Sequence, residues 1–487
     1  MRARTNLLAA AWALLAAGCF SPAARQAADW RELRPPALRP FKPQQPQRLT
    51  LPNGMLILLQ EDRELPLIRG RVRIRGGSRE ESAAKVGLVS IYAQAWRTGG
   101  SVRRGGDALD DFLEMRAAKV ETWGEMDSTG VSFNCLKEDF EAVFSVVEEL
   151  LFSEPAFPQD KLELAKRQLN TGIARRNDSH AEIAAREAAK LVYGADSPYA
   201  RVPEYATVKA VTREDLAAWH RDYVHPNNAI LSIVGDFDPL QMAARLEKSF
   251  GAWPRGPAAA KTEPGFPAPK PGVYVADKED VKQSNLRLVH LGITMDNPDY
   301  FAVQVMNRIF GGSFGSRLVT HVRSRKGLAY AVRGGVGAAM DHPGLFQVMM
   351  GTKTESTAAG IDALLEEIDA LRRTPPTPEE LQRAKDGLLN SFVFRFDSRE
   401  KTLEEQATLA FYGYPPDFLD GYEAAIRAVT AADVMRVADR YVHRDKLAIL
   451  VVGNTKDFDR DLSGFGPVTR VDLTIPRPDD TGGKPGT

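Results

Sequence analysis

The feature that most constrains the fold of this chain is an internal repeat. Residues 206–235 and 424–453 align without a gap, and the second copy lies 218 positions after the first. Each copy reads as a capped helix, a Tyr-Val-His turn and an apolar strand that ends at glycine. Chance similarity between amphipathic helices does not readily place all three in one register. Ten of the thirty aligned pairs are identical: Ala206/Ala424, Ala210/Ala428, Val211/Val429, Thr212/Thr430, Asp215/Asp433, Tyr223/Tyr441, Val224/Val442, His225/His443, Val234/Val452 and Gly235/Gly453.

The repeat continues upstream at an offset of 219 positions and predicts two copies of one folding unit. A chain of 487 residues is long for a single hydrophobic core, which agrees with a duplication. Strand–turn–strand patterns are mixed with helical ones and do not alternate strictly, so we predict the α+β fold class. The additional matching pairs are Leu162/Leu381, Ala165/Ala384, Lys166/Lys385, Asp178/Asp397, Ser179/Ser398, Tyr193/Tyr412 and Gly194/Gly413.

Composition predicts where the folded parts begin and end. The proline-dense stretch 254–272 marks a linker between two domains, at 48–253 and 273–475. Residues 20–47 are rich in Pro, Ala, Arg and Gln and have no sustained periodicity, so they are predicted to be a flexible tether. Residues 476–487 are predicted to be a disordered tail.

The first 19 residues have the pattern of an export signal. Two arginines precede an apolar run, Leu7 to Ala17, that is too short to span a bilayer. The run ends in Ala-Ala-Gly-Cys, which resembles a bacterial lipobox whose Cys19 becomes the lipid anchor. Its first position is Ala16 and not the usual Leu, so ordinary signal cleavage without a lipid stays open. Both interpretations predict an exported protein, either periplasmic or an outer-membrane lipoprotein.

Charge and cysteine content exclude several classes of protein. Lys plus Arg and Asp plus Glu both number 64, so no global field favours nucleic acid or acidic partners. The two cysteines, Cys19 and Cys135, are too few for a disulfide scaffold or a cysteine-rich zinc site. Cys135 lies in a strand-like run and is predicted to be a small buried apolar residue.

One stretch, Ser316 to Tyr330, carries a candidate site. Arg323 offers a fixed fork of donors and Tyr330 a hydroxyl, which together suit a peptide carbonyl or a developing oxyanion. The two are seven positions apart, and a short helix that ends at Gly327 would bring both toward one side. Chemistry alone leaves a second interpretation open, in which Arg323 lies on a solvated face and Tyr330 starts a half-buried strand.

The pattern S-R-L-x-x-x-V-R-x-x-x-G-L-A-Y in this stretch resembles the second-domain signature of insulinase-like zinc metallopeptidases, which include pitrilysin and the mitochondrial processing peptidase. The resemblance covers about residues 48–475. It implies two homologous half-units, each a mixed, mostly antiparallel sheet packed with helices. It also implies that Arg323 and Tyr330 contact a bound peptide across a chamber from a zinc ion.

The zinc motif of that family is missing. Its first domain carries H-x-x-E-H on the helix after the third strand, with two His ligands and a Glu base, and a further Glu ligand some 75 residues on. In this chain the His, Glu and His positions are Ser90, Ala93 and Gln94, and the later Glu position falls near Gly172. The chain is therefore predicted to hold no metal and to hydrolyse no peptide alone.

The resemblance implies a division of labour between two subunits. We expect the chain to be the non-zinc subunit of a heterodimeric metallopeptidase, with zinc in an H-x-x-E-H partner, peptides as substrates and no nucleic acid. Arg323 and Tyr330 would then act in trans. A glycine-rich loop resembles the substrate-handling loop of the processing peptidase, although a plain helix break explains it equally well; its glycines are Gly311, Gly312 and Gly315. The alternative function is an inactive structural or peptide-binding protein of the same fold.

Overall fold

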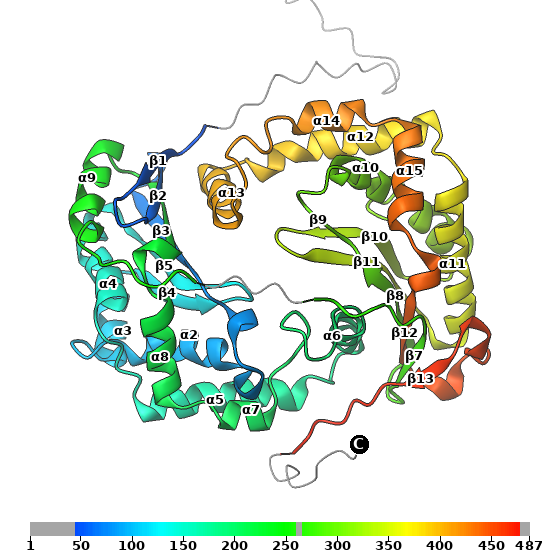
Figure 1. Cartoon of the computed structure of the whole chain (residues 1–487), viewed down its shortest axis with the longest axis horizontal. Coiled ribbons are helices and arrows are strands. Elements are labelled where there is room, and N and C mark those ends of the chain that lie inside the picture. Colours follow the sequence, from blue (N-terminus) through cyan, green and yellow to red (C-terminus); the bar gives the residue numbers. More distant parts are fainter. Residues whose placement is uncertain (1–43, 260–264, 478–487) are drawn as a thin grey trace, which may run out of the picture. The chain divides into compact units, whose positions relative to one another are not determined.

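Two β-sheets organise the chain, and the strands that the repeat aligns take matching places in them (Figure 1). The N-terminal sheet has the order β1-β2-β6-β3-β5-β4, and the C-terminal sheet has β13-β7-β12-β8-β11-β10-β9. Neighbours are antiparallel except for the pairs β2–β6, β7–β12, β7–β13 and β9–β10. The strands are β1 (Gln47–Thr50), β2 (Leu56–Glu61), β3 (Leu67–Arg75), β4 (Lys119–Gly124), β5 (Ser128–Leu136), β6 (Ala229–Gly235), β7 (Gly272–Asp277), β8 (Gln283–Leu291), β9 (Ile293–Thr294), β10 (Ala331–Ala339), β11 (Pro343–Lys353), β12 (Ala448–Gly453) and β13 (Val468–Arg470).

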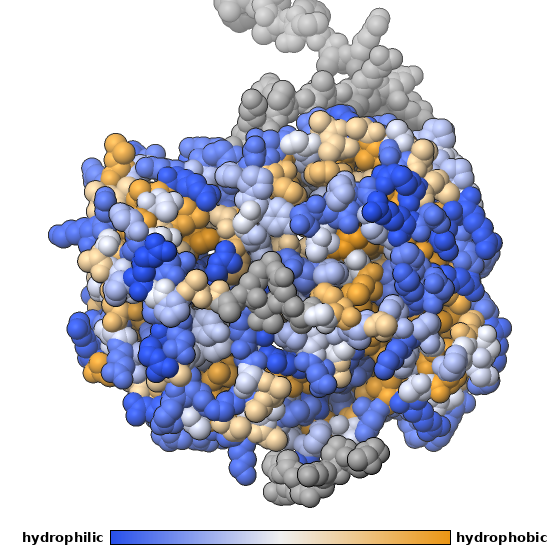
Figure 2. All heavy atoms as spheres, in the orientation of Figure 1, coloured by the Kyte–Doolittle hydropathy of each residue, from blue (hydrophilic) through white to orange (hydrophobic). Residues whose placement is uncertain are grey.

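This computed structural model describes residues 44–259 and 265–477, all within one unit that spans 43–487. The predicted export signal with Cys19, most of the tether, residues 260–264 of the linker and the end of the tail lie outside the described residues. Among the described residues no helix is both long and apolar enough to span a membrane. On the face drawn in Figure 2, hydrophilic residues spread over the surface with smaller apolar patches between them.

Helices cover the outer face of each sheet, and the side chains of the strands alternate to match. On β3, Ile68, Val72 and Ile74 are buried on the face toward α2 and α4, while the arginines between them point to the opposite face. The helices are α2 (Leu88–Gly99), α3 (Gly106–Glu114), α4 (Phe140–Phe152), α5 (Gln159–Arg175), α6 (His180–Tyr193), α7 (Tyr205–Lys209), α8 (Arg213–Tyr223), α9 (Pro239–Phe250), α10 (Tyr300–Phe310), α11 (Thr357–Arg373), α12 (Pro378–Phe392), α13 (Arg399–Tyr412), α14 (Tyr422–Ala428) and α15 (Ala431–Tyr441).

The predicted fold class is confirmed. Strand β6 and helix α8 belong to the first copy of the repeat, and β12 and α15 are their counterparts in the second. Helices α8 and α15 both begin at the predicted threonine caps, where Thr212 accepts from the Asp215 amide and Thr430 from the Asp433 amide. The chain is thus α+β, with two half-units whose five shared strands have the same order, β2-β6-β3-β5-β4 and β7-β12-β8-β11-β10, while the edge strands β1, β13 and β9 differ.

Each half sends one helix to the sheet of the other half. Helix α6 precedes Gly194 in the first half, yet it packs on β8 and β12 of the C-terminal sheet. Its repeat counterpart, α13, packs in return on β2 and β6 of the N-terminal sheet, as Figure 1 shows. The side chains that dock α13 are Leu403, Ala407 and Phe411, against Leu58, Ile230 and Val234. We call α6 and α13 the exchanged helices. The face of each sheet on which an exchanged helix packs is called the inner face.

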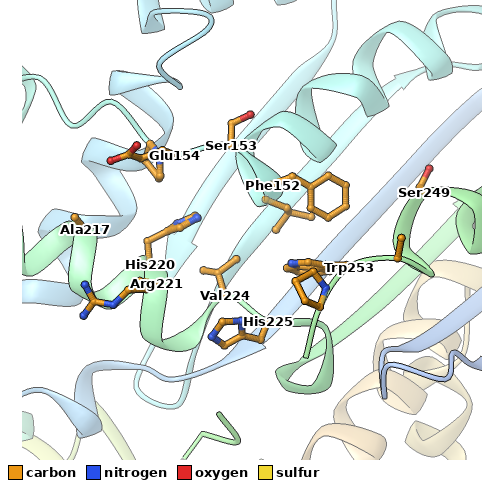
Figure 3. A pocket seen from close by; sticks show the side chains of 14 residues that line it. Phe152, Ser153, Glu154, Ala217, His220, Arg221, Val224, His225, Ser249 and Trp253 are labelled. Atoms are coloured by element: carbon orange, nitrogen blue, oxygen red, sulfur yellow. The ribbon is translucent and has the colours of Figure 1, made fainter. Parts of the chain in front are cut away.

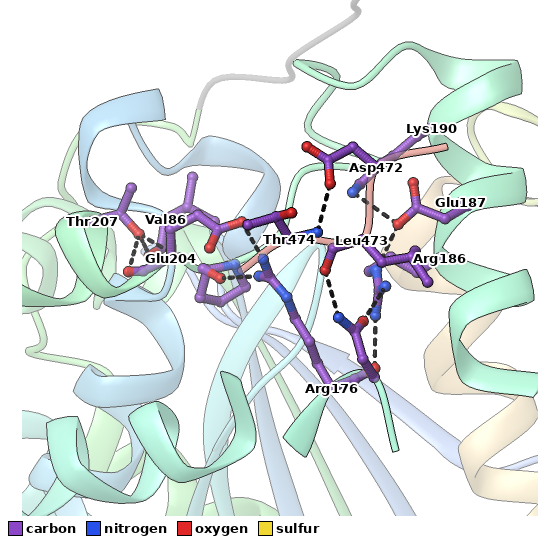
Figure 4. A network of polar contacts seen from close by, with 12 residues as sticks. Val86, Arg176, Arg186, Glu187, Lys190, Glu204, Thr207, Asp472, Leu473 and Thr474 are labelled. Atoms are coloured by element: carbon purple, nitrogen blue, oxygen red, sulfur yellow. Dashed lines mark hydrogen bonds and ion pairs between the residues drawn. The ribbon is translucent and has the colours of Figure 1, made fainter. Parts of the chain in front are cut away.

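The segment after β13 also joins the two halves (Figure 4). Leu473 packs beside α6, and its carbonyl accepts a hydrogen bond of 2.6 Å from the Asn177 side chain. Ile475 then packs against the core of the N-terminal half. The adjacent Arg176 forms an ion pair of 2.8 Å with Glu204. The end of the described chain therefore crosses from the second half back to the first.

Cys135 is buried as predicted, at 2% exposure. Burial raises the pKa of its thiol to about 12, so the group stays protonated and unreactive.

Candidate functional site

Helix α2 occupies the place of the zinc helix, and it begins at a buried carboxylate. Glu81 accepts hydrogen bonds from the amides of Gly87, at 3.0 Å, and Val89, at 2.7 Å. These amides belong to the first turn of the helix, where donors have no partner within the helix itself. Burial raises the pKa of the Glu81 carboxyl, because desolvation disfavours its charged form. This contact fixes the start of the helix.

The three motif positions on α2 offer no metal-binding group. Ser90 is exposed, Ala93 is buried and Gln94 is half-buried. Gln94 donates from its Nε2 to Oε1 of Gln168 on α5, so two neutral amides are paired beside the motif positions. Zn²⁺ in proteins takes thiolate, imidazole or carboxylate ligands, so these residues do not fit zinc. Within the described residues, no group of three or more His, Cys, Asp or Glu side chains is arranged to hold a metal.

The resemblance placed the later glutamate position near Gly172; in the structure the residue of α5 that is hydrogen-bonded to Gln94 of α2 is Gln168. Gly172 lies one helical turn further on, and a Cβ added there would meet nothing within 4 Å. The sequence did not single out Gln168, because its residue type does not mark it as a partner of α2. The register of α5 against α2 is a tertiary feature.

The terminal strand of the N-terminal sheet runs beside this helix. Thr122 of β4 donates its hydroxyl to the carbonyl of Ala93. A Cβ added to Gly124 would lie 2.5 Å from Cγ1 of Val89, so the strand approaches α2 closely. Because β4 is the last strand of its sheet, its outer edge is a place where an extended peptide can add by hydrogen bonds.

Arg323 lies on a helix of an unexpected type. The sequence predicted an ordinary helix before Gly327, but Leu318–Arg325 is a π-helix. The amide of Lys326 accordingly donates to the carbonyl of His321, five positions earlier, at 3.0 Å. Gly327 closes the turn with φ of +66°, a left-handed conformation that suits glycine, as predicted. The side chain of Arg323 is exposed and makes no hydrogen bond or ion pair with any other described residue.

Tyr330 precedes β10 and is 82% exposed. Its amide pairs with the carbonyl of Gly351, which holds the backbone against β11 while the ring projects into solvent. The phenol makes no hydrogen bond or ring contact with another described side chain. Arg323 and Tyr330 therefore both present their side-chain donors to solvent.

The glycine loop between α10 and the π-helix has at least one structural glycine. A Cβ on Gly311 would lie 2.4 Å from the amide nitrogen of Gly334, so only glycine allows this approach to β10. Gly315 has no such restriction, since its nearest neighbour would be 3.9 Å away. Phe314 is 86% exposed. The close packing of Gly311 supports the plain helix break for that residue, and it does not decide the roles of Gly312 and Gly315.

A partly buried ion pair anchors the start of the π-helix. Arg317 forms two hydrogen bonds of 2.9 Å with the two carboxylate oxygens of Glu380. Its remaining donors reach the carbonyls of Thr374 and Pro375. The guanidinium holds the pKa of the Glu380 carboxyl below its ordinary value. Such a fork fixes the backbone from which Arg323 projects.

The N-terminal half also contains a cavity of about 700 Å³ at the end of α8, lined by His220, Phe152 and Trp253 among others (Figure 3). Nδ1 of His220 lies 2.9 Å from the hydroxyl of Tyr92, which is fully buried. Burial raises the pKa of Tyr92, so its hydroxyl stays protonated beside the imidazole. Burial also lowers the pKa of His220 to about 3. This histidine is therefore neutral.

The comparisons with known proteins agree on one family. Residues 210–388 match the family described as "Peptidase M16 inactive domain". The "Non-peptidase homolog YmxG" of Helicobacter pylori is 24% identical over 409 residues, which cover 82% of this chain and 92% of that protein. The "Uncharacterized zinc protease YmxG" of Bacillus subtilis is 23% identical over 354 residues, covering 72% of this chain and 85% of that protein.

Solved structures extend the similarity to the whole fold. A crystal structure of a peptidase M16 inactive domain from Pseudomonas fluorescens superposes with a TM-score of 0.76 and 26% identity, over 85% of this chain and 98% of that one. A protease from Helicobacter pylori has the same fold, with a TM-score of 0.73 and 17% identity. In sequence over residues 210–388 and in fold over most of its length, the chain is similar to the peptidase M16 inactive domain, the insulinase-like family that the Ser316–Tyr330 motif indicated.

Proposed function

We propose that this chain is the non-zinc subunit of a heterodimeric M16 metallopeptidase and that it works in trans on peptides bound to a zinc-bearing partner. The observation that carries the proposal is the asymmetry between the two motifs. The zinc positions of α2 hold a serine, an alanine and a glutamine paired with Gln168, whereas Arg323 and Tyr330 remain exposed and without partners among the described residues.

In this arrangement the partner supplies the zinc, which polarises the scissile carbonyl and activates water. Arg323 and Tyr330 of this chain donate hydrogen bonds to the carbonyl oxygen of the substrate. They stabilise the negative charge that develops there in the transition state. The anchored π-helix holds Arg323 for this task, and Gly311, Gly312 and Gly315 shape the loop beside it.

The test is a reconstitution with a zinc-bearing H-x-x-E-H partner and a fluorogenic peptide. Arg323→Ala and Tyr330→Phe should each lower kcat about 10²–10³-fold, as the loss of one oxyanion donor typically does. Arg325→Ala is the matched control, because Arg325 is an exposed arginine of the same π-helix without an ion pair to a described residue. Unchanged hydrolysis by both variants in an intact complex would refute the proposal.

A second candidate is peptide binding or a structural role without any part in catalysis. The name of the Helicobacter pylori relative, a non-peptidase homologue, favours it. In that case a complex with a partner would form, and every variant would hydrolyse peptides as the unmodified complex does.

We also propose that the chain is exported and anchored through Cys19, on the strength of the signal pattern before it. Labelled fatty acid should enter the unmodified protein and not Cys19→Ser. Label in both proteins, or in neither, would contradict the lipid anchor.

A further inference from the structure

The inner faces of the two sheets carry different charge patterns at equivalent positions. In the N-terminal sheet, Arg71 of β3 pairs in register with Ser132 of β5, and Ser132 pairs with Glu121 of β4. Side chains that face one another across neighbouring strands lie on the same face, so this row places an arginine and a glutamate on either side of a small serine. The row combines a positive and a negative charge.

The repeat identifies the equivalent row in the C-terminal sheet. Arg71 pairs with Ser232, and Arg287 of β8 pairs with Leu450, which is 218 positions after Ser232. From Arg287 the register continues to Met349 of β11 and to Arg333 of β10. The position of Glu121 is thus taken by Arg333. The second row carries two positive charges, one on each side of a methionine.

The carboxylates and the ring that surround Arg71 are also missing around Arg287. Arg71 forms ion pairs with Glu125, at 3.0 Å, and with Glu404 of the exchanged helix α13, at 3.5 Å. Its guanidinium also lies 3.8 Å from the centroid of the Trp123 ring. On the other exchanged helix, α6, the residue equivalent to Glu404 is Ala185. The residue equivalent to Glu400, the neighbouring glutamate of α13, is Ala181. The residue equivalent to Trp123 is Gly335.

Arg287 and Arg333 therefore lack an acidic partner among the described residues. Arg287 donates one hydrogen bond, of 3.1 Å, to the side-chain oxygen of Gln347, and its buried Nε has no acceptor. The contact of the Arg333 side chain is with the sulfur of Met349. Burial, and after it the positive charge of Arg333, lowers the pKa of Arg287 below its ordinary value. Two guanidinium groups close enough to repel each other are stabilised when an anion lies between them.

We propose that Arg287 and Arg333 form a carboxylate-binding site on the inner face of the C-terminal sheet, and that the site takes an acidic group of an extended peptide. This inference rests on the proposed function for the identity of the ligand as a peptide. Each guanidinium presents a planar fork of donors, so a carboxylate that bridges the pair gains charge-assisted hydrogen bonds from both sides. Arg333 is exposed, which leaves the site open to solvent.

The test measures binding to the purified chain alone by fluorescence anisotropy. The probes are three fluorescein-labelled octapeptides that differ only in charge: two central glutamates with an amidated end, two central glutamines with a free C-terminal carboxylate, and two central glutamines with an amidated end. Tighter binding of the first probe assigns the site to acidic side chains, and tighter binding of the second assigns it to the peptide C-terminus. Equal binding of all three, or no binding, would overturn the inference.

Two variants test the residues themselves. Arg333→Glu copies the charge pattern of the N-terminal row and should raise the Kd of the favoured probe about 10- to 100-fold, since hydrogen bonds to charged groups contribute that much. Arg69→Glu is the matched control, because it makes the same change of charge on the inner face of the N-terminal sheet, where Arg69 pairs with Glu400 at 2.7 Å. It should leave the Kd within about twofold, well below the tenfold that 1.4 kcal/mol represents.

If Arg333→Glu and Arg69→Glu raise the Kd by the same factor, binding depends on overall charge and the proposed site is refuted. The assay contains no zinc-bearing partner, so it stands apart from the test of the proposed function. Loss of trans catalysis with retained peptide binding refutes the proposed function alone, and loss of selective binding with retained trans catalysis refutes this site alone.

Discussion

Replacement of Phe411 by alanine should undock the exchanged helix α13 from the N-terminal sheet. Phe411 is 1% exposed and packs with Leu403 and Ala407 against that sheet. A buried phenylalanine removes roughly 150–250 Å² from water, which at about 25 cal/mol per Å² corresponds to about 4–6 kcal/mol. Alanine keeps a small part of this, so Phe411→Ala should cost about 3–5 kcal/mol, the usual range for this substitution.

Tryptophan fluorescence can follow the affected half selectively. The four described tryptophans lie before residue 254, and residues 273–475 contain none. Phe411 belongs to the second half of the chain but packs on the N-terminal sheet. Phe411→Ala should therefore shift the urea-unfolding transition that the tryptophans of the N-terminal half report. With a slope of about 3 kcal/mol per M urea, the midpoint should fall by about 1–1.7 M. Circular dichroism, which reports both halves, should show the transition split in two.

Two controls define the result that would refute this reasoning. Phe411→Leu nearly conserves volume and should cost less than about 1.5 kcal/mol. Val192→Ala changes the equivalent position of α6 and should cost about 1–2 kcal/mol, at about 0.8 kcal/mol for each buried methylene. If Phe411→Ala moves the fluorescence midpoint by less than about 0.3 M urea, the exchanged helix does not stabilise the sheet on which it lies.

Three further predictions concern charge and metal. Arg317→Met should lower the free energy of unfolding by about 1–3 kcal/mol at pH 7. Arg317 depresses the folded pKa of Glu380, so the difference in the free energy of unfolding between the unmodified protein and the variant should shrink as the pH falls below about 4. A difference that does not vary with pH would contradict this role of Arg317. Burial lowers the pKa of His220 to about 3 in the folded protein, so between about pH 6.5 and pH 3 the unfolded chain alone binds this proton. Stability should therefore fall by up to about 1.4 kcal/mol for each pH unit of acidification in this window. His220→Gln should flatten that slope in urea titrations, and an unchanged slope would exclude this histidine as its cause. In a variant that carries Ser90→His, Ala93→Glu and Gln94→His, the further change Gln168→Glu should complete a zinc site. Elemental analysis should then detect one bound zinc per chain. Gly172→Glu in place of Gln168→Glu should give no bound zinc.

The fold class and the repeat could be predicted because both follow from local patterns in the sequence. Threonine caps and apolar strands recur at fixed offsets, and they form the same elements in both halves. The exchange of α6 and α13 could not be predicted in this way. An amphipathic helix shows that it has an apolar face, but its sequence does not say which sheet receives that face.

The candidate site was predictable only in part for a related reason. The loss of zinc ligands at Ser90, Ala93 and Gln94 is visible in the residue types themselves. The contact between Gln94 and Gln168 depends on how two helices are aligned, and the π-helical form of Leu318–Arg325 depends on its packing against α11 and β10. Neither is encoded in a spacing pattern. The unpaired arginines of the second sheet likewise emerge only when strand register brings Arg287 and Arg333 onto one face.

The exchanged helices have a consequence for how such a protein can arise. A single half made alone would leave an apolar strip of its sheet bare and would carry a helix without a docking place. Two identical copies would satisfy each other, as in a symmetric homodimer whose interface is self-complementary. Joining them in one polypeptide keeps that mutual fit and removes the requirement that both copies stay alike. One copy is then free to give up its metal while the other acquires a new pattern of charge.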